Sequence, residues 1–343
     1  MKKVFWWRIF SLVLVTGACA GAASWLWQGM QSVLERRIVL HERSELFEIE
    51  RGTSLAEIAR RMENLGWLGN DLYLKLEARR LNVGANLKAG LYEVYDGTTP
   101  RKLLQKIVNG DVKVFQITFI EGSTFTEMRD VLEGHKHLIH TIEEEDDAWV
   151  MAQIASSFER PEGRFFPSTY NFSHGDSDLD ILRRAYQRMV ELLAFHWESR
   201  EPDLPYESPD DALIMASIIE KETGRADERA QIAGVFVRRL RLGMKLQTDP
   251  TVIYGIGKNF DGNLRRVDLE TDTEYNTYTR YGLPPTPIAM PGVASISAGL
   301  HPAPGKFLYF VGKGDGSHAF STSLAEHNAA VRRFQLPGRS AQQ

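Results

Sequence analysis

The sequence predicts an α+β protein in three parts: an apolar N-terminal helix, a small βααβ module and a larger mixed α+β domain. Three observations lead to this prediction. Residues 9–27 form a stretch of 19 uncharged residues. Between residues 46 and 134, short strands alternate with glycine turns and amphipathic helices. Residues 208–224 have the pattern of one strongly apolar helix, and the loops that follow it are rich in Pro and Gly.

Length and composition narrow the class of function. A chain of 343 residues is long enough for two or three domains with a large core. It has 41 Lys and Arg residues against 45 Asp and Glu, and no basic stripe, so nucleic acid is not an expected partner. The single cysteine, Cys19, lies in the apolar N-terminal stretch. Disulfides and thiolate metal sites are therefore not expected in the rest of the chain.

Residues 1–28 are predicted to be a transmembrane anchor. The uncharged stretch is close to the length that crosses a bilayer. Trp25 and Trp27 stand where the far interface of the membrane would be. Basic residues precede the stretch, on the side expected to stay in the cytoplasm: Lys2, Lys3 and Arg8. A cleaved signal peptide and a lipoprotein modified at Cys19 are the alternatives, and Thr16 counts against the second because a lipobox usually has Leu there.

After a linker at residues 29–44, residues 45–118 are predicted to form the small module. Strands near residues 47 and 92 enclose helices at 55–65 and 71–81. The order strand, helix, helix, strand resembles a LysM module, which implies a fold associated with binding N-acetylated sugar chains. The alternative is a spacer that holds the next domain away from the membrane.

Residues 119–337 are assigned to the larger domain and residues 338–343 to a polar tail. An aromatic loop at 161–172 and an amphipathic helix at 177–195 precede the apolar helix, and a further helix follows at 226–242. Three arginines of this last helix are expected to face solvent: Arg238, Arg239 and Arg241. No metal site is predicted, because the histidines near residue 137 lack ligands at a spacing that would fix a coordination geometry.

The helix at 208–224 has well-marked ends. Ser208 is suited to the N-cap, and Gly224 is a natural stop. Because every residue from 212 to 219 except Ser217 is apolar, the helix should be buried.

Glu220 follows the apolar run, which is an unusual place for a carboxylate. Its neighbours on the same face include the small residues Ala216 and Ser217, so room is expected beside the carboxyl group. Burial disfavours the anion, and a neutral carboxyl group can donate a proton. Glu222 points to nearly the opposite side and is expected to be structural. An ordinary helix-end ion pair is the alternative for Glu220.

Several segments together resemble the endolytic murein transglycosylase family, also called the YceG-like family. They are ASIIEKET at 216–223, RLRLGMKLQTDPTVIYG at 239–255, YNTY at 275–278, GLPP at 282–285 and YFV at 309–311. The loop EGRFFPSTYNF at 162–172 is also similar, although Ser168 stands where an acidic residue is common. The resemblance implies a YceG-like catalytic domain at 119–337.

The resemblance implies cleavage of the bond between N-acetylmuramic acid and N-acetylglucosamine in peptidoglycan strands, leaving a 1,6-anhydro end. A usual glycosidase needs two carboxyl groups. Here the substrate's own 6-hydroxyl attacks, so a single group can suffice. Glu220 would donate a proton to the leaving oxygen and then, as a carboxylate, take the proton of that hydroxyl. No cofactor is expected.

Gln247, Asn276 and Tyr278 are candidates for holding hydroxyl or acetamido groups of the sugars, with scaffolding of the loops as the alternative for each. Asp249 is interpreted either as a turn residue or as the second carboxylate of a hydrolase that uses Glu220. A non-catalytic peptidoglycan-binding anchor is another alternative. The resemblance also implies a single-pass protein of the bacterial inner membrane, with a periplasmic catalytic domain that ends the elongation of nascent strands beside penicillin-binding proteins.

Overall fold

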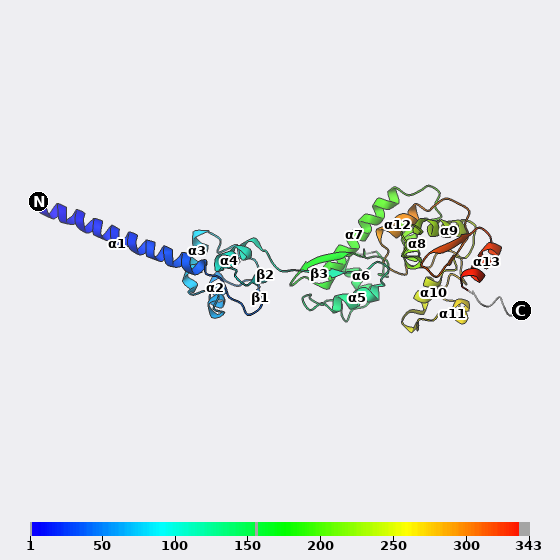
Figure 1. Ribbon diagram of the computed structural model, residues 1–343, viewed down its shortest axis with the longest axis horizontal. Helices are drawn as coiled ribbons and strands as arrows, with labels where there is room; N and C mark the ends of the chain where they lie inside the picture. Colours follow the sequence, from blue (N-terminus) through cyan, green and yellow to red (C-terminus); the bar gives the residue numbers. More distant parts are fainter. Residues whose placement is uncertain (1, 155–156, 336–343) are drawn as a thin grey trace. The chain divides into compact units, whose positions relative to one another are not determined.

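The computed structural model describes residues 2–154 and 157–335, without the side chains of residues 2–5, 8, 9 and 11 (Figure 1). The chain divides into two compact units. Unit 1 comprises Met1–Phe115 and Ser173–Gly175, and unit 2 comprises Gln116–Phe172 and Asp176–Gln343. Helices and short strand pairs occur in the same chain, which confirms the predicted mixed α+β class. The predicted tail at 338–343 lies outside the described residues.

The N-terminal helix α1 spans Lys2–Leu34 and extends beyond the predicted anchor at 1–28. Its described apolar side chains from Trp6 to Trp27 are exposed, whereas Met30 and Leu34 are buried in the core of unit 1. The side chains of Lys2, Lys3 and Arg8, on which the predicted orientation depends, lie outside those described. Among the described residues, none of the helices combines the length and the apolar character that crossing a membrane requires.

Unit 1 has the predicted order of strand, helix, helix and strand. Its elements are β1 (Ser44–Ile49), α2 (Leu55–Asn64), α3 (Asp71–Arg80), β2 (Gly90–Tyr95) and α4 (Pro100–Asn109). The two strands pair antiparallel, with Ser44 opposite Tyr95 and Ile49 opposite Gly90. Side-chain oxygens of Ser54, Asn70 and Thr99 cap the three helices. The kinship of this unit with LysM modules stays a prediction.

Unit 2 is built mainly from helices around one core, with the strand pair β5–β6 and most of the pair β3–β4, whose outermost residues, Val114, Phe115 and Ser173, are assigned to unit 1. Its helices are α5 (Phe125–Glu133), α6 (Asp147–Gln153), α7 (Asp178–Glu198), α8 (Pro209–Glu222), α9 (Arg229–Arg241), α10 (Asp249–Ile256), a 3₁₀ turn (Gly257–Asn259), α11 (Arg266–Glu270), α12 (Val293–Leu300) and α13 (Leu324–Phe334). The strands are β3 (Val114–Thr118), β4 (Thr169–Ser173), β5 (Tyr309–Gly312) and β6 (His318–Ser321).

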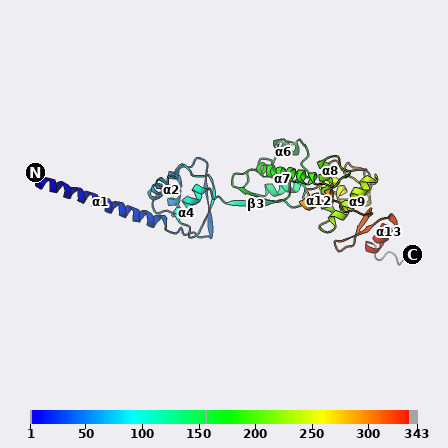
Figure 2. The same cartoon turned by 90° about the horizontal axis from the view of Figure 1, so that it is seen from above.

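Helix α8 lies at the centre of the unit 2 core. Ser208 and Asp211 form a capping box at its start, and Ala212–Ile219 are all buried. Helix α12 packs along α8, and both views show the two side by side (Figures 1 and 2). The expectation of room beside Ala216 and Ser217 was wrong, because both residues are fully buried: Gly299 of α12 lies next to Ala216, and the segment at Ile288 covers Ser217. Ser217 Oγ instead accepts the N–H of Ile288 at 3.0 Å.

Two glycines, one in α9 and one in α12, allow a test of how tightly these helices pack against the rest of unit 2. A Cβ at Gly234 of α9 would lie 2.4 Å from the carbonyl oxygen of Ala303, whereas a Cβ at Gly299 of α12 would meet only ordinary contacts, the nearest being Ile219 Cδ1 at 3.7 Å. Gly234→Ala should therefore lower the free energy of unfolding by about 1–3 kcal/mol. Gly299→Ala should be neutral or slightly stabilising, because Ala is the better helix former. Thermal unfolding followed by circular dichroism compares the two; equal losses would contradict the packing.

Candidate functional site

A cavity of about 480 Å³ in unit 2 brings together residues from six parts of the chain. The end of α8, helix α9, the start of α10 with the residues before it, the loop at Tyr278, the β5–β6 hairpin and α13 all contribute to its wall. Its charged and polar side chains include Glu222, Arg239, Gln247, Asp249, Tyr278 and His318. Two of the three predicted sugar-binding residues, Gln247 and Tyr278, therefore lie in one cavity. Glu220 does not line it.

Glu222, the last residue of α8, has the environment of a proton donor. Thr248 Oγ1 donates a hydrogen bond to Glu222 Oε1. Burial raises the pKa of Glu222 to about 7, against the lowering effect of the Thr248 bond, and the neighbouring charge of Asp249 raises it further. A carboxyl group with such a pKa is partly protonated at neutral pH, so it can donate a proton and later take one back. The hydrogen bond agrees with the structural role expected for Glu222, but its place in the cavity was not foreseen.

The segment at Gln247 is held in a conformation that costs energy. Gln247 has a φ of 50°, which is uncommon for a residue other than glycine. Its N–H donates to the carbonyl of Thr277 at 3.1 Å, and the N–H of Thr248 donates to the Thr277 hydroxyl at 3.1 Å. These bonds fix a strained turn whose side chains face the cavity, and strain of this kind clusters at functional sites.

Tyr278 and Asp249 form a hydrogen-bonded pair on the same wall. Tyr278 Oη donates to Asp249 Oδ1 at 2.5 Å. Burial raises the pKa of the Tyr278 phenol, so this group stays a neutral donor at physiological pH. The pair places a second carboxylate in the cavity that contains Glu222.

Asn276, two residues before Tyr278 in the chain, is fully buried and does not line the cavity. Its Oδ1 accepts the N–H of Tyr278 at 2.8 Å. Its Nδ2 donates to three backbone carbonyls, those of Asp268, Leu269 and Thr271. With both ends of the amide engaged, the geometry of Asn276 is that of the loop scaffold considered as its alternative.

Arg239 supplies a fixed positive charge, and the expectation that it faces solvent was wrong. The side chain is buried because the hairpin and the loop after α9 cover this face of the helix. Its Nε donates to the carbonyl of Leu308 at 2.7 Å, and its Nη1 donates to Leu246 O at 2.8 Å and Gln247 Oε1 at 3.4 Å. Burial lowers the pKa of the Arg239 guanidinium. The burial of Arg239 could not be predicted from the sequence, because the hairpin that covers it lies far away in the chain.

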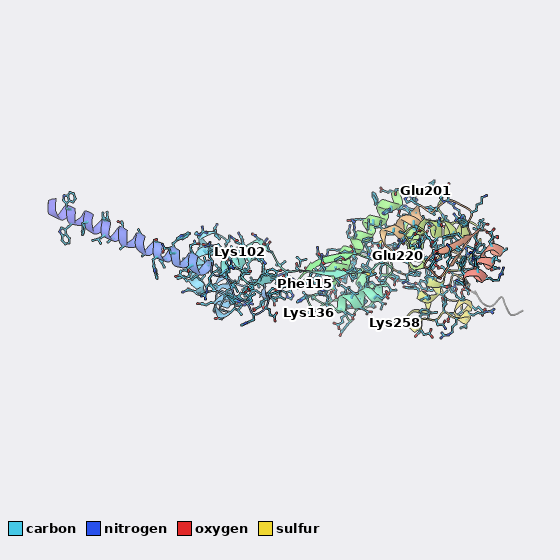
Figure 3. All side chains as sticks on the ribbon, in the orientation of Figure 1. Lys102, Phe115, Lys136, Glu201, Glu220 and Lys258 are labelled. Atoms are coloured by element: carbon cyan, nitrogen blue, oxygen red, sulfur yellow. The ribbon has the colours of Figure 1, made fainter. Side chains whose placement is uncertain are left out.

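Glu220, labelled in Figure 3, contacts the start of α12 and does not line the cavity. Its side chain is only 7% exposed. The N–H of Gly292, the N-cap residue of α12, donates to Glu220 Oε2 at 2.9 Å, and Arg229 Nη2 lies 3.7 Å from Oε1. A carboxylate at this position complements the amino end of α12. The catalytic role of Glu220 stays a prediction, and its contacts are those of a residue that joins three helices.

A second buried acid occurs in the aromatic loop. Glu162 accepts the N–H of Phe125 and the hydroxyl of Tyr254, both at 3.1 Å, and so links α5 with α10. Burial raises the pKa of Glu162 to about 7. Glu162 lies outside the cavity. Within residues 2–154 and 157–335, no group of three or more His, Cys, Asp or Glu side chains is arranged to hold a metal ion.

Comparison with known proteins gives consistent matches. A profile of the YceG-like family matches residues 47–333. The endolytic murein transglycosylase of Bacillus subtilis (strain 168) is 34% identical over 269 residues, covering 73% of this chain and 74% of that protein. The endolytic murein transglycosylase of Streptococcus pneumoniae (strain ATCC BAA-255 / R6) is 24% identical over 341 residues, covering 88% of this chain and 61% of that protein. The crystal structure of a YceG-like protein from Listeria monocytogenes superposes with a TM-score of 0.52 at 29% identity, covering 83% of this chain and 98% of that one.

Proposed function

The chain belongs to the YceG-like family and is a lytic transglycosylase, and from this premise we propose that it is an endolytic murein transglycosylase. It would cleave the bond between N-acetylmuramic acid and N-acetylglucosamine within peptidoglycan strands and leave a 1,6-anhydro end. One observation supports this chemistry above all. In a cavity of about 480 Å³, a carboxyl group with a pKa of about 7 shares the wall with Gln247, Tyr278 and Arg239.

Glu222 is the acid that the geometry favours. In its protonated form it can donate to the glycosidic oxygen as the bond to the leaving sugar breaks. The 6-hydroxyl of the muramic acid closes on the anomeric carbon, so no nucleophile from the enzyme is needed. The carboxylate that results is then able to take the proton of that hydroxyl. Polar groups of Gln247 and Tyr278 on the same wall are suited to hold the sugar.

Glu220, the acid predicted from the sequence, is the second candidate for the role of single acid and base. Its low exposure supports it. Against it, Glu220 does not line the cavity, and its carboxyl group is already engaged by the N–H of Gly292 and by an ion pair with Arg229. Replacing each glutamate by glutamine separates the two candidates.

A glycan hydrolase is the second candidate function, favoured by the presence of Asp249 in the cavity with Glu222. Two carboxyl groups could activate water, and the product would then carry a reducing muramic end. Digestion of purified glycan strands in ¹⁸O-labelled water, followed by mass spectrometry, distinguishes the two reactions. The transglycosylase gives anhydro ends without label, because no water is added. Labelled reducing ends as the main product would overturn the proposal.

We also propose that α1 anchors the protein in the cytoplasmic membrane, with units 1 and 2 in the periplasm. The uncharged stretch at 9–27 and the exposed apolar side chains of α1 support this location. The protein would end the elongation of nascent strands beside penicillin-binding proteins, with unit 1 contacting glycan. Cell fractionation provides the test: the full chain should sediment with membranes and a chain lacking residues 1–28 should not. Equal release of both into the soluble fraction would contradict the anchor.

A further inference from the structure

His318 lies in the cavity and is held there by a buried carboxylate. The residue opens strand β6, and its side chain is 14% exposed. Its ring Nδ1 lies 2.6 Å from Glu228 Oε2, and its backbone N–H donates to Glu228 Oε1 at 3.1 Å. Glu228 itself is buried at the start of α9, with Arg225 Nε at 3.8 Å from Oε1. Two bonds to one carboxylate give the imidazole a fixed position.

The contact with Glu228 also determines which ring nitrogen carries the proton. A carboxylate only accepts hydrogen bonds, so Nδ1 of His318 must be the donor. In the neutral imidazole, Nε2 is then an unprotonated acceptor. Among the described residues no protein group bonds to this Nε2. The cavity therefore contains an oriented base whose proton-accepting atom is unoccupied.

The proposed reaction requires two proton transfers, and Glu222 alone would have to perform both. One proton goes to the leaving oxygen and another comes from the attacking hydroxyl. His318 and Glu222 line the same cavity, and their surroundings suit opposite tasks, because Glu222 is a proton donor and Nε2 of His318 is an acceptor. Pairs of groups whose surroundings differ in this way are typical of separate acids and bases.

We propose that Nε2 of His318 takes the proton of the muramic 6-hydroxyl as that oxygen attacks the anomeric carbon. This inference rests on the proposed function. The bond from O6 to the anomeric carbon forms, the bond to the leaving oxygen breaks, and the proton of Glu222 passes to the leaving oxygen. The imidazolium that results is stabilised by the Glu228 carboxylate. The enzyme resets when His318 releases its proton to solvent and Glu222 takes one up.

The test uses the full chain, purified glycan strands and three variants. His318→Asn keeps a side-chain N–H that can bond to Glu228 but has no base at the position of Nε2. Its kcat for anhydro ends should fall roughly 10²-fold or more, with KM little changed. The kcat of His318→Ala should fall by a similar factor, and free imidazole, which fits the space left in the cavity, should restore part of it. His327→Asn is the matched control, since His327 lines the same cavity and its Nδ1 has no hydrogen-bond partner within the described part of the chain. Its rate should not depend on imidazole.

The dependence of kcat/KM on pH supplies a second measurement, because it reports on the acid Glu222 separately from the base. In the wild type the rate should fall as Glu222 loses its proton above a pH of about 7. The other charged groups that face His318 or its cavity are Glu228, Arg225, Arg239, Asp249 and His327. His318→Asn should keep this fall at its reduced rate, because Glu222 still donates the proton. A near wild-type rate in His318→Asn, or no response of His318→Ala to imidazole, would overturn the inference. Reducing ends from the wild type would instead overturn the proposed function.

Discussion

Replacement of Glu222 by Gln is expected to lower kcat for the release of anhydro ends by roughly 10²–10⁴-fold, the range that general acid catalysis supplies. Gln has nearly the same shape as Glu and can still accept the Thr248 hydroxyl, so the wall of the cavity should be preserved. It has no proton to give to the leaving oxygen. The rate is measured by chromatography of the products from purified strands.

The stability of the same variant shows whether a lost rate reflects chemistry or misfolding. Burial raises the pKa of Glu222 in the folded state to about 7, against 4.5 for a glutamate in water. The wild type therefore loses stability as pH rises from about 4.5 through 7, because the buried group must ionise. Glu222→Gln lacks this loss and should unfold at the same or a higher temperature than the wild type at pH 8. A much lower unfolding temperature would attribute the inactivity to the fold.

Activity of the wild type should fall about tenfold for each pH unit above about 7, which is the second large effect. The sign follows from the role of Glu222: only its protonated form donates, and that form is lost as pH rises through the pKa of about 7. The charge of Asp249 helps to raise this pKa, so Asp249→Asn should move the falling limb to lower pH. The measurement is kcat/KM between pH 5 and 9 at constant ionic strength.

Glu220→Gln is the matched control for this pH dependence. Glu220 does not line the cavity, so the falling limb should keep its position in this variant. A wild-type rate that stays flat up to pH 9 would contradict the assignment of Glu222 as the acid. So would a fall in rate at high pH that disappears in Glu220→Gln and persists in Glu222→Gln.

Local features of the fold could be predicted because local chemistry determines them. The helix predicted at 208–224 is found at Pro209–Glu222, and Ser208 caps it together with Asp211. Ser177 caps α7 in the same way. A cap depends only on residues three or four positions apart, so its signal is fully contained in a short stretch of sequence. The antiparallel strands of unit 1 likewise follow from alternation and turn residues.

The candidate site was predicted only in part, because its walls come from distant segments. Gln247 and Tyr278 do line one cavity, but periodicity could not show which face of α8 that cavity adjoins. The face with small residues was expected to be open, yet α12 and the segment at Ile288 cover it. The face of Glu222 adjoins the cavity because the β5–β6 hairpin and α13, about a hundred residues later in the sequence, form the other wall without covering it. Arg239 was misplaced for the same reason.

The most direct test of the account compares the ends released from peptidoglycan strands by the wild type, Glu222→Gln and Glu220→Gln under identical conditions. Mass spectrometry identifies 1,6-anhydromuramic ends and counts them against reducing ends. We expect anhydro ends from the wild type and from Glu220→Gln, and almost none from Glu222→Gln. Abundant anhydro ends from Glu222→Gln, with none from a folded Glu220→Gln, would contradict the account and return the catalytic role to Glu220.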